Sequence, residues 1–169
     1  TREMSCLSLR DAIDNADIST EEDLTAYARQ ITDATSDGSE LNDGAVIYCT
    51  YALQSLVVTN HRVIESANAI TDALNALSNI FHARTKLPQE VLELTNMILE
   101  AIGTNQRTRL VAGEPAENVI SSLFRISSRL YSREDTASAE LSVPLNAVEI
   151  SNSLVAPSII NDITALAIS

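Results

Sequence analysis

The stretch HRVIESANAITDALNALSNIFH, residues 61–82, does most to determine the fold of this chain. Apolar side chains recur in it at alternating steps of four and three residues: Val63, Ala67, Ile70, Leu74, Leu77 and Phe81. This spacing places them on one face of an α-helix. Glu65, Asp72 and Asn79 lie seven apart and face away from that seam. The seam is too short for a long coiled coil and favours a helix within a bundle.

Similar apolar spacing predicts helices on both sides of this stretch. The segments are residues 4–16, 20–35, 44–58, 88–102 and 115–131. A Ser19-x-x-Glu22 capping box is expected to begin the second of them. Gly103 is expected to end the helix over 88–102. We predict a core that includes Val63, Ile70, Leu74, Leu77 and Leu123.

The pattern changes after Tyr131. Residues 132–138 are polar and predict a linker, whereas apolar residues alternate over 139–151 in the manner of a β-strand. Pro144 indicates an edge strand, and residues 157–168 fit a short helix or a further strand. The sequence therefore predicts a mainly α fold: a bundle of five to six helices over residues 1–131, followed by a short strand-like segment over 139–169.

The composition excludes several classes of partner. The chain has 169 residues, 45% of them hydrophobic, which is enough for one domain with its own core. Its formal net charge is -12, and residues 1–60 alone carry eleven acids and three arginines. Such a surface repels nucleic acids and anionic membranes. The acidic N-terminal third fits a solvated surface, a basic partner or divalent cations.

No apolar run approaches the roughly 18 residues that a membrane span needs. The N-terminus, Thr1-Arg2-Glu3-Met4, lacks an initiator methionine and a signal-peptide pattern. We therefore expect a mature or excised piece of a longer protein.

The two cysteines, Cys6 and Cys49, are too far apart in sequence for a CxxC redox or zinc pair. Each shares a helical face with core residues, so we expect them to lie on neighbouring helices and to point inward. If oxidised, they would close a loop of about 44 residues. The alternative is a pair of buried free thiols.

The most site-like stretch is the acidic loop over residues 33–44. Aligned as a calcium loop, Asp33, Thr35, Asp37 and Gly38 occupy the first ligand positions, but the twelfth position is Gly44 where a bidentate glutamate is needed. A solvated loop rich in turn-forming residues is the favoured interpretation.

Other residue patterns do not predict catalysis. His61 and His82 lie at opposite ends of one predicted helix, roughly 30 Å apart, so they cannot share a metal within the chain. Serines at 121, 122, 127 and 128 are expected on a helix as small packing residues. Arg125 and Arg129 could grip an acidic surface or lie on a solvated face. We expect no catalytic residue, cofactor or metal, and no enzymatic activity.

Part of the chain resembles the helical subdomain of GAIN domains. The run Ser39-Glu-Leu-Asn-Asp43 followed by the predicted helices over 45–58 and 63–81 resembles the order of segments in that subdomain. Within it, the run Ala73-Leu-Asn-Ala-Leu-Ser-Asn-Ile-Phe-His-Ala83 is similar to the family's Leu-Ser-Asn-Leu-Leu helix, and residues 116–123 look like its last helix. The likeness spans residues 9–131. It implies the extracellular part of an adhesion G-protein-coupled receptor or a polycystin-1-like protein. The autoproteolytic tripeptide of that family is lacking, since Ala83 follows His82 and Arg62 follows His61.

We therefore expect a non-enzymatic interaction or mechanical module from the extracellular region of a larger membrane-associated protein. Its partner would be another protein or neighbouring domains of the same chain, without direct membrane insertion. One alternative is a cytoplasmic helical-bundle adaptor resembling vinculin or talin rod segments. Another is a helical sensor domain of a bacterial receptor. The redox state of Cys6 and Cys49 distinguishes the extracellular hypothesis from the cytoplasmic one.

Overall fold

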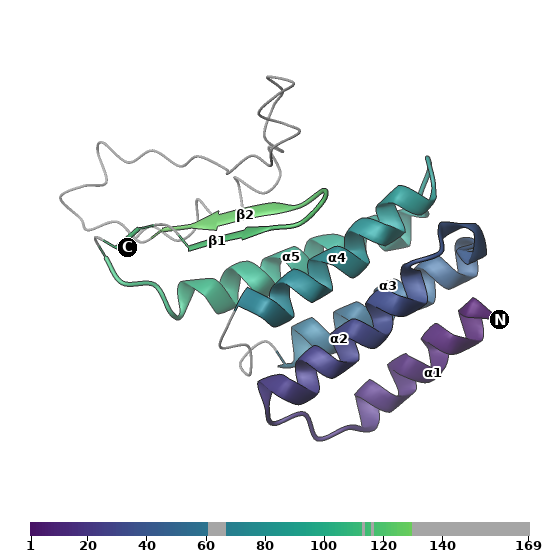
Figure 1. Cartoon of the computed structure of the whole chain (residues 1–169), viewed down its shortest axis with the longest axis horizontal. Coiled ribbons are helices and arrows are strands. Elements are labelled where there is room, and N and C mark those ends of the chain that lie inside the picture. The colour runs from purple at the N-terminus through teal and green to yellow at the C-terminus, as the bar shows by residue number, and fades with distance from the viewer. Residues whose placement is uncertain (61–66, 113, 116, 130–169) are drawn as a thin grey trace. The chain divides into compact units, whose positions relative to one another are not determined.

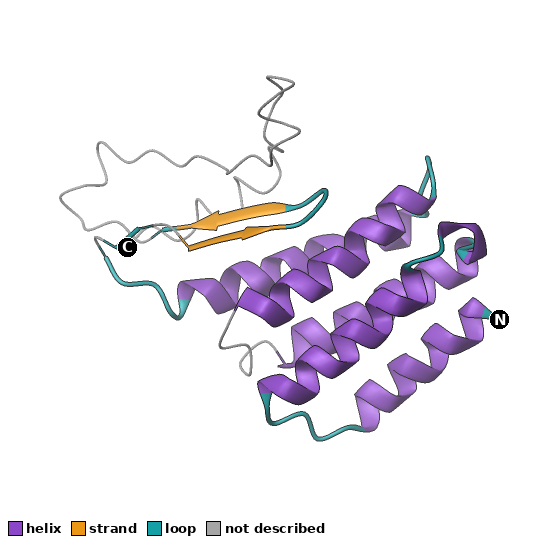
Figure 2. Cartoon of the chain, viewed as in Figure 1, coloured by secondary structure: helices purple, strands orange, loops and turns teal. Residues whose placement is uncertain are grey.

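The computed structural model describes residues 1–60, 67–112, 114–115 and 117–129, and this part of the chain is mainly helical (Figure 1; Figure 2). The elements, in order, are α1 (Arg2–Asn15), α2 (Glu21–Thr35), a short 3-10 helix η1 (Gly38–Glu40), α3 (Asp43–Asn60), α4 (Ala67–Ala83), α5 (Gln89–Arg107), β1 (Glu117–Ile120) and β2 (Arg125–Ser128). The chain forms two compact units, Thr1–Ile102 and Gly103–Ser169, so their boundary falls inside α5.

The five helices of the first 107 residues confirm the predicted bundle, with two local corrections. Thr20, not Ser19, caps α2, because its extended backbone lets Oγ1 accept a hydrogen bond from the amide of Asp23 at 3.3 Å. Gly103 does not end α5, which continues to Arg107. Glycine is tolerated inside a helix at a cost of about 1 kcal/mol relative to alanine, so it does not by itself force an end.

In the first unit, α1 packs mainly on α3, and α2 packs mainly on α4. Along α1 and α3, Cys6 contacts Cys49 and Arg10 contacts Tyr51, so the residue numbers of the contacts increase together. Along α2 and α4 they also do, because Thr32 contacts Asp72 and Thr35 contacts Asn79. Each of these two helix pairs therefore runs in the same direction, as Figure 1 shows for α1 and α3. Sequence neighbours also pack together, α1 with α2, α2 with α3 and α3 with α4, so these four helices form one bundle.

Helix α3 lies at the centre of the core of this unit. Half of its residues are buried, on several sides of the helix: Ala45, Val46, Cys49, Thr50, Ala52, Leu53, Ser55, Leu56 and Val57. A helix that is apolar nearly all round is covered by neighbours on most of its surface. Ile70, Leu74 and Leu77 of α4 are also buried, as predicted. Leu123 is half-buried, and Val63 lies outside the described residues.

Asp72 and Asn79, which the sequence places away from the apolar seam of α4, contact helix α2. The hydroxyl of Thr32 in α2 donates to the carbonyl of Asp72 at 3.1 Å. The side-chain amide of Asn79 donates to Thr35 Oγ1 at 3.3 Å and to the Thr32 carbonyl at 3.5 Å. Asp72 and Asn79 therefore form part of the packing between α2 and α4. Glu65 lies outside the described residues.

The helix predicted over 115–131 is wrong. Strands β1 and β2 pair antiparallel instead, with Val119 opposite Ile126 and Glu117 opposite Ser128. The turn between them is closed by Ser121, whose amide donates to the Phe124 carbonyl at 2.8 Å and whose hydroxyl accepts from the Phe124 amide at 3.0 Å. Serine side chains compete with helical hydrogen bonds in this way. The predicted linker over 132–138 and the strand-like segment over 139–169 lie outside the described residues.

Candidate functional site

The two cysteines, predicted to face each other on neighbouring helices, do so. Cys6 on α1 and Cys49 on α3 form a disulfide, and their Cα atoms lie 4.8 Å apart. Both side chains are fully buried. A disulfide sealed in this way offers no thiolate for nucleophilic attack or for metal binding. Its role in the fold is to join two helices.

The disulfide is the middle of three contacts along one face of α1. Arg2, Cys6 and Arg10 are four residues apart, so they lie one above another on the helix. Arg2 forms an ion pair with Glu40 at the end of η1. The guanidinium of Arg10 lies over the ring of Tyr51 on α3, 4.5 Å from its centroid. One charge pair, one covalent bond and one cation–π contact thus hold α1 in place.

Tyr51 extends this set of contacts to a third helix. Its hydroxyl forms a hydrogen bond with the carboxylate of Glu90 on α5. That hydrogen bond is the main reason why the pKa of Tyr51 is raised above its ordinary value. Tyr51 therefore connects α1, α3 and α5 within the first unit, and its hydroxyl keeps its proton at neutral pH.

The acidic stretch over residues 33–44 comprises the end of α2, the short helix η1 and the start of α3. The carboxylate of Asp37 accepts hydrogen bonds from the amide of Ser39 at 3.0 Å and from its hydroxyl at 2.6 Å. Both hydrogen bonds lower the pKa of Asp37, and the one from the Ser39 hydroxyl has the larger effect. Thr35 is buried, and its hydroxyl donates to the carbonyl of Ile31. Two residues of the proposed calcium loop therefore make local contacts: Asp37 caps η1, and Thr35 bonds within α2.

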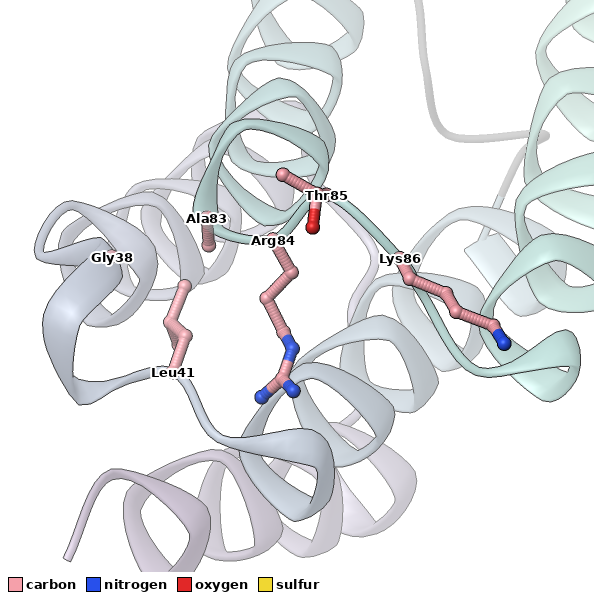
Figure 3. A pocket seen from close by; sticks show the side chains of 6 residues that line it. All are labelled: Gly38, Leu41, Ala83, Arg84, Thr85 and Lys86. Atoms are coloured by element: carbon pink, nitrogen blue, oxygen red, sulfur yellow. The ribbon is translucent and has the colours of Figure 1, made fainter.

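A pocket of about 460 Å³ opens between the end of α4 and η1 (Figure 3). Its lining is Gly38, Leu41, Ala83, Arg84, Thr85 and Lys86. Arg84 reaches the carboxylate of Asp43 at the start of α3, 3.0 Å away, while Lys86 extends away from the other side chains. Cations after a helix C-terminus are stabilised by the helix dipole. The basic residues at this pocket are accounted for by that effect and by Asp43.

A second pocket, of about 470 Å³, lies between the first turns of α2 and the beginning of α4. It is lined by Glu21, Glu22, Thr25, Ala26, Arg29 and Asn68. Arg29 also lies 3.7 Å from the carboxylate of Asp72. Acids in the first turn of α2 complement the positive end of that helix, so their presence has a structural reason.

The serines and arginines assigned to a sixth helix belong to the hairpin. Ser121 is in its turn, and Ser127 and Ser128 are in β2. Arg125 is 1% exposed and is therefore not available to grip an acidic surface. The hydroxyl of Ser128 donates to Oε1 of Gln106 at 2.6 Å. These side chains, like the Arg109–Glu117 ion pair at 2.7 Å, stabilise the second unit internally.

Of the two histidines, His82 is exposed in the last turn of α4, and His61 lies outside the described residues. In the part of the chain that the structure describes, no three His, Cys, Asp or Glu side chains come together as metal ligands would. Within the same residues, no helix has both the length and the apolar character needed to cross a membrane. Comparisons with protein-family models, curated proteins and solved structures find no match to this chain.

Proposed function

We propose that this chain is a non-enzymatic interaction or mechanical module from the extracellular region of a larger membrane-associated protein. The observation that carries the proposal is the buried Cys6–Cys49 disulfide. Structural disulfides persist in oxidising compartments and are rare in the cytosol. A covalent bond between two packed helices also suits a domain that must keep its shape while attached to other parts of a protein.

Four further polar side chains of the first unit support a structural role. Arg2, Arg10, Arg84 and Asp37 are each engaged in an ion pair, a ring contact or a helix cap. A catalytic site instead collects side chains whose protonation or nucleophilicity is poised for chemistry. The partner in this proposal is another protein or a neighbouring domain, and the acidic surface favours a basic one.

The GAIN-like part of the proposal rests on residues 39–83, which comprise most of η1, all of α3 and all of the described part of α4. The segment over 116–123, likened to the last helix of the family's helical subdomain, contains strand β1 and part of the turn instead. Residues 116–123 therefore do not carry the resemblance. The helical portion remains a proposal.

A thiol count tests the compartment. The protein is purified from its native source with alkylation during lysis, then unfolded, and its free thiols and mass are measured before and after reduction. We expect no free thiol and a monomer mass before reduction, and two thiols afterwards. Two free thiols before reduction would contradict the extracellular proposal and favour a cytoplasmic adaptor resembling vinculin or talin rod segments. A disulfide-linked dimer would contradict the pairing of Cys6 with Cys49.

A further inference from the structure

Helix α1 buries few of its residues against the bundle. Of its fourteen residues, Cys6 and Ile13 are buried. Much of its attachment therefore comes from the disulfide and from the contacts of Arg2 and Arg10. At Gly44 in the first turn of α3, an added Cβ would lie 2.5 Å from Oε2 of Glu3, so the missing side chain leaves room for the Glu3 carboxylate of α1 beside α3. The covalent bond thus joins two helices already in close contact.

The position of the bond along the two helices matters as much as its presence. Cys6 lies in the second turn of α1, and Cys49 lies in the second turn of α3. The closed loop between them contains the rest of α1, all of α2, η1 and the beginning of α3. A pulling force applied at the N-terminal end of the unit therefore reaches the disulfide at Cys6.

We propose that the Cys6–Cys49 disulfide is a mechanical bypass. Tension applied between the two ends of the chain passes from α1 directly into α3, and residues 7–48 do not extend. This inference rests on the proposed role as a mechanical module, and it assigns the load path within it. The loaded path runs through α3, α4 and α5, while α2 lies inside the protected loop.

The bypass determines which packing is lost first under load. Helix α4 carries the tension and α2 does not. The contacts between them therefore join a part of the chain that is pulled to a part that is not. These contacts are the Thr32–Asp72 and Asn79–Thr35 hydrogen bonds and the Arg29–Asp72 ion pair. Separation of α4 from α2 is therefore a required step in extending the oxidised unit.

The increase in contour length expected on opening the loop follows from the number of residues inside it. The cysteines are 43 residues apart in sequence, and their Cα atoms are 4.8 Å apart in space. At a fully extended reach of up to about 3.6 Å per residue, opening the loop adds about 150 Å of contour length. Single-molecule force spectroscopy resolves such a difference.

The experiment stretches the full chain from handles at its two ends. The oxidised protein is compared with a Cys6→Ser, Cys49→Ser double variant. We expect the total contour length of the variant to be greater by about 150 Å. Equal contour lengths would overturn the proposal.

Two insertions provide a matched control that does not depend on folding of the cysteine variant. Ten Gly/Ser residues are inserted after Ser36, inside the loop, or after Thr85, outside it; both positions are exposed. In the oxidised protein the outer insertion should add about 36 Å and the inner insertion nothing. Lengthening by the inner insertion would overturn the bypass. This result is independent of the thiol count in the native compartment, so the two proposals fail separately.

Discussion

At the scale of single residues, Asp37 shows how a metal-like acidic pattern can serve a different purpose. Its carboxylate is the N-cap of η1 and is occupied by the amide and hydroxyl of Ser39. Aspartate is favoured at such positions because its oxygens satisfy amides that a helix start leaves without partners. The sequence of the loop is compatible with both uses, and local hydrogen bonding decides between them.

The hydrogen bonds to Asp37 make a prediction about its titration. They favour the ionised carboxylate, so its pKa in the folded protein lies below its ordinary value. The associated stability is present above the ordinary pKa and is lost as pH falls through the lowered one. Carboxyl-carbon NMR should show a titration midpoint for Asp37 below the ordinary value of an aspartate side chain. Ser39→Ala should move it upward, and an unchanged midpoint would contradict the assignment.

The core position Leu74 gives a prediction about packing. Its side chain is 0% exposed, so Leu74→Ala should lower the free energy of unfolding by about 2–5 kcal/mol through lost burial and a residual cavity. Urea denaturation measures the change. The matched control is Leu92→Ala on α5, where the side chain is 38% exposed and the loss should be under about 1 kcal/mol. A loss below about 0.5 kcal/mol at Leu74 would mean that the seam is not part of the core.

At the scale of elements, the contact between α2 and α4 combines apolar packing with side-chain hydrogen bonds. Asn79→Ala removes two hydrogen bonds to α2 and should lower the free energy of unfolding by roughly 1–2 kcal/mol. Asn96→Ala on the exposed face of α5 is the control and should change it by less than about 0.5 kcal/mol. Equal effects in denaturation experiments would show that the Asn79 bonds contribute nothing to packing.

Helix α1 should depend on the disulfide more than the other helices do. In the chain-entropy account, losing a cross-link that closes a loop of 43 residues costs about 4 kcal/mol. In the Cys6→Ser, Cys49→Ser variant, amide hydrogens of α1 should exchange faster than those of α4, because α1 has two buried residues to hold it. Hydrogen exchange measured by NMR tests this order. Uniform acceleration across all helices would contradict it.

At the scale of the whole molecule, the net charge of -12 opposes compaction. Raising the ionic strength from about 0.01 M to 0.15 M shortens the Debye length from about 30 Å to 8 Å and screens that repulsion. The melting temperature should therefore rise with added NaCl. Calcium at matched ionic strength should give the same rise. A larger, saturable effect of calcium would reveal a specific cation site and contradict this expectation.

The β1–β2 hairpin is a place where the spacing of apolar residues predicts the wrong secondary structure. Val119, Leu123, Ile126 and Leu130 have helical spacing, and that spacing led to the erroneous sixth helix. Two signals pointed the other way: β-branched residues at 119, 120 and 126, and the serine pair at 121–122. The Ser121 hydroxyl closes the turn locally, but strand pairing needs a partner that no single window of sequence contains.

The periodicity of the sequence is enough to predict five helices, their inward faces and the inward positions of Cys6 and Cys49 on two of those helices. Each of these follows from the 3.6-residue period of a helix, which every turn repeats locally. The tertiary structure alone decided that α1 lies parallel to α3, that Asp72 and Asn79 contact α2, and that residues 117–128 pair as strands. These outcomes depend on which surfaces meet, because burial and hydrogen bonding between distant segments outweigh the small intrinsic preferences of individual residues.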